Sequence, residues 1–172
     1  MRQQLIRLSR PLDDYSLHRA VYERFAAPRG RHFTFTPVEL PSGPAVLVRG
    51  DLQDGEEVAV PAAGSEVRFM LRATVSRHDK ETGKRGAWSK QNTEARLQWL
   101  HRQGEANGFE VIQACVTVSS TNIERGKGRF WLDVSRFIGT LRVTDQVRFA
   151  EALRRGVGKG KAFGFSTLIV IN

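Results

Sequence analysis

The sequence contains a single cysteine, Cys115, and no apolar run of the length that a membrane span requires. One thiol can form neither an internal disulfide nor a multi-cysteine zinc site, and a membrane helix needs about 20 consecutive apolar residues. The first fifteen residues hold only short apolar pieces, which is not the pattern of a signal peptide. These absences predict a protein of the reducing cytoplasm without a disulfide framework.

Acidic residues are scarce in one part of this 172-residue chain, whose formal net charge is +9. Residues 1–60 contain 8 basic and 8 acidic side chains, whereas residues 61–172 contain 19 basic and 10 acidic ones. Such a basic region favours a polyanionic partner, and nucleic acid is the first candidate. An anionic membrane is less well supported, because no long basic amphipathic helix is evident. A soluble protein that is basic without a specific partner is the alternative on charge alone.

Hydrophobic patterns of strand and helix type alternate in both halves of the chain. In the first half they predict strands at 4–8, 32–35 and 45–48, and a helix that begins at Asp13–Asp14. In the second half they predict helices at 93–104 and 145–155, and strands at 67–73, 109–119, 129–134, 137–143 and 162–171, the last interrupted by Gly164.

This order approximates βαββαβ twice. We therefore expect an α+β fold of two tandem ferredoxin-like domains, residues 1–60 and 65–172, joined by the uncharged stretch 58–64. The first half lacks a convincing second helix, since only residues 51–58 are available for it. A single α+β domain is therefore the alternative.

A glycine-rich loop between the last predicted helix and the last predicted strand is the most specific feature. Residues 154–165 read RRGVGKGKAFGF, with four glycines among cations. Glycine permits positive φ and close approach to a ligand, and exposed backbone N–H groups beside Lys159 and Lys161 suit phosphate oxygens. The loop has no P-loop pattern, and it follows a helix, whereas a Rossmann loop opens one. A helix end with solvated lysines is the structural alternative.

Tyr15 and His18 are three residues apart on the first predicted helix, so they share one face. An imidazole titrates near neutral pH and can accept or donate a proton, although such a pair can also be purely structural. Cys115 lies inside an apolar predicted strand, so we expect a buried small residue rather than a nucleophile. No metal-ligand spacing relates the remaining histidines, His32, His78 and His101.

Together these features resemble the CasE type of CRISPR-associated repeat-RNA endoribonucleases, a branch of the RAMP superfamily found in Cascade (type I-E) systems. That family carries Tyr-x-x-His on its first helix, matched here by Tyr15 to His18. Its C-terminal signature GhGxxxxxGhG matches residues 156–166, except that Ser166 replaces the final glycine. Residues 69–73 (FMLRA), 82–85 (TGKR) and 97–100 (LQWL) also agree.

The resemblance extends in order along nearly the whole chain, with two departures. The chain is shorter than expected, with reduced connections in residues 36–62 and 113–130, and Thr74–Val75 replaces the family's Asn-Pro. We expect the glycine-rich loop to keep its path despite Ser166, with Gly158 and Gly164 in the demanding backbone conformations.

The resemblance implies a metal-independent, cofactor-free endoribonuclease that binds the CRISPR repeat hairpin and cleaves precursor CRISPR RNA at the 3′ base of the stem. Attack by the 2′-hydroxyl would leave a 2′,3′-cyclic phosphate, with His18 as general acid/base and Tyr15 as a hydrogen-bond donor. The implied partners are the repeat hairpin or mature crRNA and other Cascade subunits, with no membrane and no small-molecule cofactor.

The residues expected to contact RNA belong to the glycine-rich loop and to two further basic segments: Arg154, Arg155, Gly156, Gly158, Lys159, Gly160, Lys161, Gly164, Lys84, Arg85, Lys90, Arg125, Lys127 and Arg129. A non-catalytic subunit that binds an RNA hairpin in the same complex is the alternative function. A metal-dependent nuclease is disfavoured, because no cluster of acidic residues is evident in the sequence.

Overall fold

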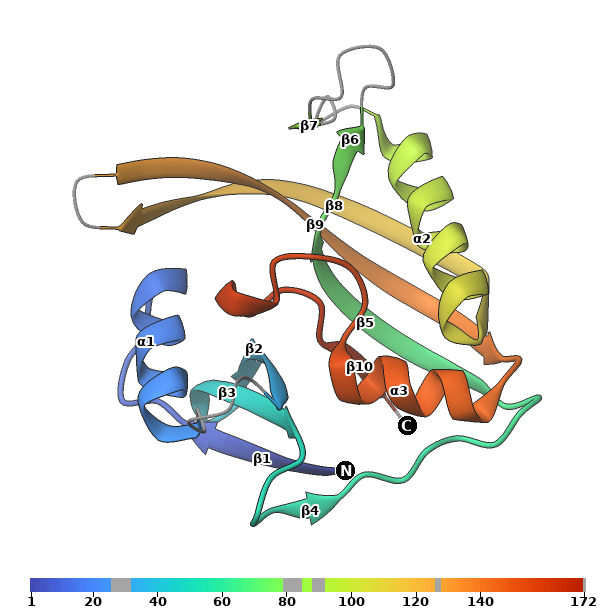
Figure 1. Ribbon diagram of the computed structural model, residues 1–172, viewed down its shortest axis with the longest axis horizontal. Helices are drawn as coiled ribbons and strands as arrows, with labels where there is room; N and C mark the ends of the chain where they lie inside the picture. Colours follow the sequence, from blue (N-terminus) through green and yellow to red (C-terminus); the bar gives the residue numbers. More distant parts are fainter. Residues whose placement is uncertain (26–31, 79–84, 88–91, 126–127, 172) are drawn as a thin grey trace.

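The computed structural model describes residues 1–25, 32–78, 85–87, 92–125 and 128–171. Its centre is a pair of four-stranded antiparallel sheets (Figure 1). The first sheet has the order β2-β3-β1-β4 and one helix, with bounds β1 Arg2–Arg7, α1 Asp14–Phe25, β2 Phe33–Leu40, β3 Gly43–Gly50 and β4 Glu56–Glu57.

The second sheet has the order β10-β5-β9-β8. Its elements are β5 Glu66–Thr74, α2 Thr93–Asn107, β8 Phe109–Arg125, β9 Gly128–Val143, α3 Gln146–Arg155, the 3₁₀ helix η1 Lys161–Phe163 and β10 Leu168–Ile171. Two further short strands, β6 Ser76–His78 and β7 Arg85–Ala87, pair with each other.

Both sheets place the fourth strand beside the first and the first beside the third, with every pairing antiparallel. This is the strand order of a βαββαβ ferredoxin-like unit, so the predicted α+β fold with two tandem ferredoxin-like units is confirmed. The first unit lacks its second helix, because residues 51–58 form bends and the two-residue strand β4. The division into domains at residues 60–65 stays a prediction that is consistent with these two sheets.

The helix α1 begins where its sequence predicts a cap. The Oδ1 atom of Asp13 accepts hydrogen bonds from the backbone N–H groups of Tyr15 at 3.0 Å and Ser16 at 2.9 Å. Bonds from the side chain and the backbone of Ser16 lower the pKa of Asp13. One face of the helix buries Leu17 and Val21 against the first sheet. The cap and this apolar stripe fix where α1 starts and which face it presents.

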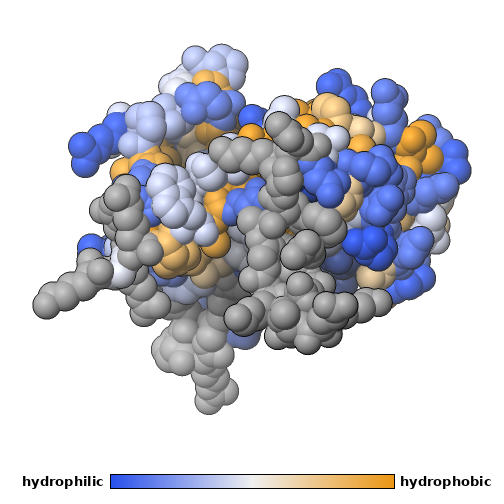
Figure 2. All heavy atoms as spheres, turned by 90° about the horizontal axis from the view of Figure 1, so that it is seen from above, coloured by the Kyte–Doolittle hydropathy of each residue, from blue (hydrophilic) through white to orange (hydrophobic). Residues whose placement is uncertain are grey.

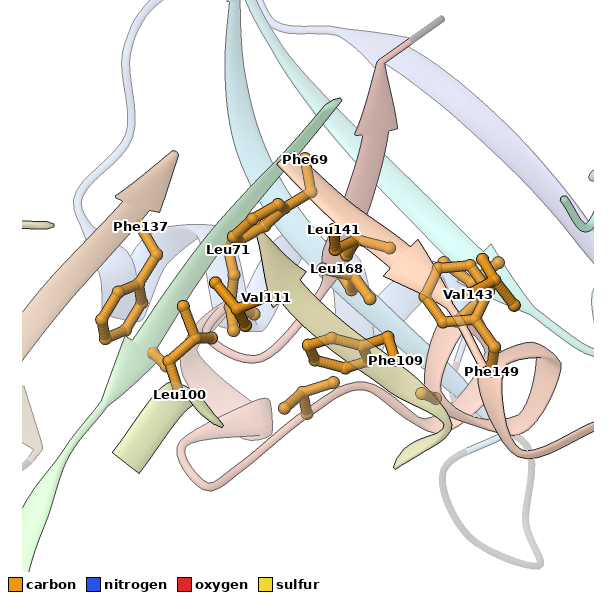
Figure 3. Close-up of a cluster of buried hydrophobic side chains, with 14 of the residues drawn as sticks. Phe69, Leu71, Leu100, Phe109, Val111, Phe137, Leu141, Val143, Phe149 and Leu168 are labelled. Carbon is orange, nitrogen blue, oxygen red and sulfur yellow. The ribbon is translucent and has the colours of Figure 1, made fainter. Parts of the chain in front are cut away.

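The larger core lies between the second sheet and the helices α2 and α3. Figure 3 shows Leu71 from β5 near Leu100 from α2, and Phe149 from α3 beside Val143 from β9, all fully buried. Burying one such side chain contributes about 1.5–3 kcal/mol relative to exposure. This core holds the sheet and the two helices as one rigid support for the segment that follows α3.

Three expectations about local structure are wrong. The predicted strands 129–134 and 137–143 are one strand, β9, because Ser135 and Arg136 continue the ladder with β5 and β8. The predicted strand 162–171 is instead η1 followed by β10, because Gly160 and Gly164 take left-handed conformations that end extended structure. Finally, Cys115 is exposed, because strand alternation turns it to the face of the sheet opposite α2 and α3.

Candidate functional site

The helix α1 and the glycine-rich loop meet at His18, although their contacting residues are 144 positions apart in the sequence. The Nδ1 atom of His18 lies 2.7 Å from the carbonyl oxygen of Ala162 in η1. A carbonyl oxygen can only accept, so Nδ1 carries the proton and donates it. In the neutral ring this leaves Nε2 without a proton, as the acceptor that a general base requires.

Aromatic rings surround this imidazole. The ring centroid of Tyr22 lies 4.2 Å from that of His18, and the centroids of Phe163 and Tyr15 lie at 5.5 Å and 6.1 Å. Phe130 on β9 meets Phe163 edge-on at 5.9 Å, so the long β8–β9 hairpin also reaches the site. Figure 1 shows the end of this hairpin extending over α1. The predicted pairing of Tyr15 with His18 on one helix face is present, within a partly buried aromatic cluster.

The glycine-rich loop owes its path to positive φ angles. Gly156, Gly158, Gly160 and Gly164 have φ between 76° and 86°, which includes both glycines expected to carry this demand. A Cβ at Gly156 would lie 2.6 Å from the carbonyl oxygen of Ser166, and one at Gly158 would lie 2.9 Å from the Trp99 ring. These contacts leave no room for a side chain. The fold of the loop therefore requires these glycines, whether or not a ligand binds there.

Ser166 adopts the conformation expected of the glycine that it replaces. Its φ is 88°, and it is the one non-glycine residue with positive φ in the part of the chain that the structure describes. Its hydroxyl donates to the carbonyl of Lys159 at 2.6 Å, and its N–H donates to the carbonyl of Arg72 at 2.5 Å. Its own carbonyl accepts from Val157 N–H at 2.7 Å. These bonds hold the loop on its path despite the serine side chain.

Three of the predicted RNA-contacting cations line one open hollow. Arg154, Arg155 and Lys161 share this hollow with His32 and Phe33. Lys161 directly precedes Ala162, the residue that accepts the hydrogen bond of His18. The hollow therefore adjoins η1, whose Ala162 contacts His18, and is rich in cationic groups.

Acidic side chains accompany the two arginines. Arg154 pairs with Asp51 and with Glu151, each at 2.8 Å, and these carboxylates raise its pKa. Arg155 also pairs with Glu151. Lys159 is exposed. Lys84, Lys90 and Lys127 lie outside the described residues, as do the side chains of Arg85, Arg125 and Arg129.

Sequence reasoning missed several members of the cluster. Tyr22 lies four residues after His18, and this helical spacing is a signal that could have found it. Phe163 meets His18, and Phe130 meets Phe163, only through the tertiary fold, and nothing in their own segments indicates these contacts. The contact with the Ala162 carbonyl had no sequence signal, because every residue carries a carbonyl group.

Two general features of the described residues complete the description. They contain no group of three or more His, Cys, Asp or Glu side chains arranged to hold a metal ion. Among their helices, none is both long enough and apolar enough to cross a membrane. Seen from above, hydrophilic side chains surround smaller hydrophobic patches (Figure 2).

Comparison with known proteins identifies the family of this chain. The family model described as "CRISPR associated protein" matches residues 56–171. The CRISPR-associated endoribonuclease Cse3 of Thermus thermophilus is 31% identical over 120 residues, which are 62% of this chain and 56% of that protein. The chain thus matches about half the length of this curated relative.

Solved structures match over the whole chain. A structure of Thermus thermophilus Cse3 bound to an RNA representing a pre-cleavage complex has a TM-score of 0.77 at 26% identity, with 100% of both chains covered. Another, of CRISPR endoribonuclease Cse3 bound to 19 nt RNA, has a TM-score of 0.82 at 23% identity, also with 100% of both chains covered, and this likeness concerns the fold alone. Because the family model covers well over half of the chain and the named relatives are of the type that the motifs indicate, the protein belongs to the CRISPR-associated protein family, as a member of its CasE type.

Proposed function

We propose that this protein is a CRISPR RNA-processing endoribonuclease. It would bind the hairpin of a CRISPR repeat and cut the precursor RNA at the 3′ base of the stem. The observation that carries the proposal is the hydrogen bond from His18 to Ala162, which joins the Tyr-x-x-His helix to the glycine-rich loop. The similarity to Cse3, named an endoribonuclease, supports the same reaction.

The reaction needs a proton acceptor, a proton donor and compensation of negative charge. The 2′-oxygen forms a bond to the neighbouring phosphorus while the bond from phosphorus to the 5′-oxygen breaks. Nε2 of His18 takes the proton of the 2′-hydroxyl, and the imidazolium can return a proton to the leaving 5′-oxygen. The products are a 2′,3′-cyclic phosphate and a 5′-hydroxyl, and no metal ion takes part in this scheme.

The other groups bind and orient the phosphate. The hydroxyl of Tyr15 can donate a hydrogen bond to a phosphate oxygen, and Lys159 and Lys161 supply positive charge on the loop beside His18. An RNA stem is recognised mainly through its shape and backbone, which suits the basic second half of the chain. Slow, single-turnover cleavage is sufficient if the protein stays bound to mature crRNA as a subunit of the Cascade effector complex.

A single-turnover cleavage assay with a repeat hairpin tests the proposal. Wild-type protein in excess over RNA, in EDTA, should yield cyclic-phosphate ends. A hairpin with a 2′-deoxy nucleotide at the scissile position should bind equally well and remain uncut. This matched substrate separates attack by the 2′-oxygen from any contaminating nuclease activity.

His18→Ala should abolish most cleavage while hairpin affinity stays nearly unchanged. Loss of a general acid/base typically costs about 10²–10⁴-fold in rate. Tyr15→Phe should cost less, because it removes one hydrogen bond and no proton carrier. Cleavage by His18→Ala at the wild-type rate would refute the catalytic assignment. Tight binding without cleavage by the wild type would favour the non-catalytic hairpin-binding subunit.

A further inference from the structure

Arg72 on β5 contacts both of the segments that the His18 hydrogen bond joins, the helix α1 and the glycine-rich loop. Its guanidinium carbon lies 4.8 Å from the centroid of the Phe165 ring, and its carbonyl oxygen accepts the N–H of Ser166. Both of these residues belong to the glycine-rich loop. From the same guanidinium, Nη1 and Nη2 lie 3.4 Å and 3.5 Å from Oδ1 of Asp14, the first residue of α1. One side chain thus links the catalytic helix to the loop.

The position of Asp14 makes this link relevant to His18. The two residues are four positions apart on α1, so their side chains lie on one face, one turn apart. The pair is mostly removed from solvent, with exposed fractions of 25% for the Arg72 side chain and 10% for Asp14. Such a pair is screened less than a surface ion pair. In Figure 1 the segment between α3 and β10, which contains η1, lies between α1 and β5.

We infer that Arg72 is a positioning residue that sets the placement of the His18 imidazole against the scissile phosphate; this rests on the proposed function. The helix α1 belongs to the first sheet unit, and the phosphate-binding loop belongs to the second. A small slide of α1 would move Nε2 away from the 2′-hydroxyl, and a misplacement of about 1 Å can cost about 100-fold in rate. Arg72 opposes that slide by holding Asp14 and Phe165 together.

The chain offers a matched control in Arg136. This residue lies directly opposite Arg72 on the neighbouring strand β9, on the same face of the sheet. The two arginines also line the same groove between the two units. However, the hydrogen bonds of Arg136 reach the sulfur of Met70, at 3.1 Å and 3.3 Å, rather than α1. A general effect of removing an arginine from this face should therefore appear equally in both variants.

The test compares Arg72→Met, Asp14→Ala, the double variant and Arg136→Met in single-turnover cleavage, with hairpin affinity measured in parallel. Methionine keeps an unbranched side chain over Phe165 and removes the cation. We expect about 10- to 100-fold slower cleavage for each of the first two variants. The double variant should be no slower than Arg72→Met, because both changes break one link. Arg136→Met should change the rate less than twofold, and all affinities should stay within twofold.

A second measurement does not depend on cleavage. The Nδ1–H proton of His18, assigned in NMR spectra by its loss in His18→Ala, should exchange slowly in the wild type and rapidly in Arg72→Met and Asp14→Ala. Arg72→Lys, which keeps the charge but not the planar fork, should fall between wild type and Arg72→Met. If Arg72→Met does not fold, Asp14→Ala and Arg72→Lys decide the question.

Several results would overturn the inference. Multiplicative rate losses in the double variant, together with weaker hairpin binding by Arg72→Met, would identify Arg72 as an RNA contact. Equal rates for Arg72→Met and Arg136→Met would show that the link has no role. An unchanged His18 exchange rate in both link variants would also overturn it, whether or not the wild type cuts RNA.

Discussion

The two sheet units of this protein differ in completeness and in charge. The first, β1 to β4, has one helix, ends in a two-residue strand and lies in a region with equal numbers of acidic and basic side chains. The second, β5 to β10, has two helices, a long hairpin and the whole charge excess. The incomplete neutral unit carries His18, whereas the complete basic unit carries the glycine-rich loop. Neither unit holds the candidate site alone.

The first sheet has α1 on one face and depends on the second unit to cover the other face. Its strand β2 begins Phe33–Thr34–Phe35–Thr36, and all four residues are buried. The phenylalanines face α1, whereas the threonines lie on the opposite face. Elements of the second unit meet that face: α3 contacts β2 and β3, and Thr167 donates to the carbonyl of Phe35 at 2.8 Å. The second unit thus covers the face opposite α1.

The two units are also expected to have different roles. In the proposed mechanism, proton transfer would take place on a helix of the neutral unit, and phosphate binding would take place in the basic unit. Variants in the two units should therefore separate the cleavage rate from RNA affinity. The predictions below test that separation and the dependence of the first unit on the second.

The largest effect should follow from removing both loop lysines. Lys159→Ala combined with Lys161→Ala should weaken hairpin binding by about tenfold per lysine, since hydrogen bonds to charged groups contribute about 1.5–3 kcal/mol. The slope of log affinity against log salt should fall by about 2, one per lost phosphate contact. Cleavage at saturating protein should change less than affinity. Titrations at several salt concentrations measure both quantities, and an unchanged slope would mean that the loop does not contact phosphates.

The next effect concerns Arg49, a buried arginine at the contact between the two units. Its guanidinium donates to the carbonyl of Leu168 at 2.7 Å and to Oε1 of Gln3 at 3.1 Å. Burial lowers its pKa to about 10. Arg49→Met removes a costly buried charge but leaves two acceptors without this donor, so we expect a net loss of about 1–3 kcal/mol in the free energy of unfolding.

Two intrinsic probes can report where Arg49→Met acts. All three tryptophans lie in the second region, and both tyrosines lie on α1. Tryptophan fluorescence and tyrosine near-ultraviolet circular dichroism should follow one denaturation curve in the wild type. In Arg49→Met the tyrosine signal should be lost at lower denaturant than the tryptophan signal. Coincident curves in the variant would show that Arg49 does not couple the units.

The ionisation of Arg49 makes the stability of the protein depend on pH in a definite direction. Its pKa in the folded state, about 10, is lower than its ordinary value in the unfolded chain, so the unfolded chain binds more protons above about pH 10. The cost of burying the charge is therefore fully present below pH 10 and is relieved as the pH rises through the folded pKa. The stability difference between wild type and Arg49→Met should shift in favour of the wild type above pH 10.

Local patterns in the sequence predicted most elements but not how the elements meet. The cap at Asp13, the helix stripe and the strand alternation of β5 are local signals, and the structure contains them. The burial of Thr34 and Thr36 was not predictable, because an alternating strand normally has one face in water and here another unit covers it. The same holds for the candidate site, where the Tyr-x-x-His pair was visible but its contact with Ala162 depends on tertiary packing.

Removing a helix cap should have a smaller effect on stability. The caps of α1 and α3 allow this effect to be compared between the two units. Asp13 caps α1, and Asp145 caps α3 with bonds from the N–H groups of Val147 and Arg148, both at 3.0 Å. Asp13→Ala should cost about 1 kcal/mol of stability, and Asp145→Ala should also destabilise. Only Asp13→Ala should slow cleavage, because α1 carries His18. Equal cleavage rates for the two variants would contradict this assignment.

These caps also predict the effect of acid. Hydrogen bonds lower the pKa of Asp13 below its ordinary value of 3.8 in the folded state. Its contribution to stability is therefore present above pH 3.8 and is lost as the pH falls through the folded pKa. Thermal melts between pH 2 and 7 should show wild type and Asp13→Ala converging only below pH 3.8. Convergence near neutral pH would contradict the cap.

The smallest effect should come from Ser166, where two contributions oppose each other. A residue other than glycine at φ 88° bears a strain of about 1–3 kcal/mol, while the hydroxyl bond to Lys159 contributes about 0.5–1.5 kcal/mol. Ser166→Gly removes both, so the two changes partly cancel and its stability should stay close to that of the wild type. Ser166→Ala keeps the strain and loses the bond, so it should be less stable than Ser166→Gly by about 1 kcal/mol or more. Denaturant titrations of the two variants isolate the backbone contribution. If alanine is as stable as glycine at this position, the loop bears no strain there, and the serine is simply an accepted replacement.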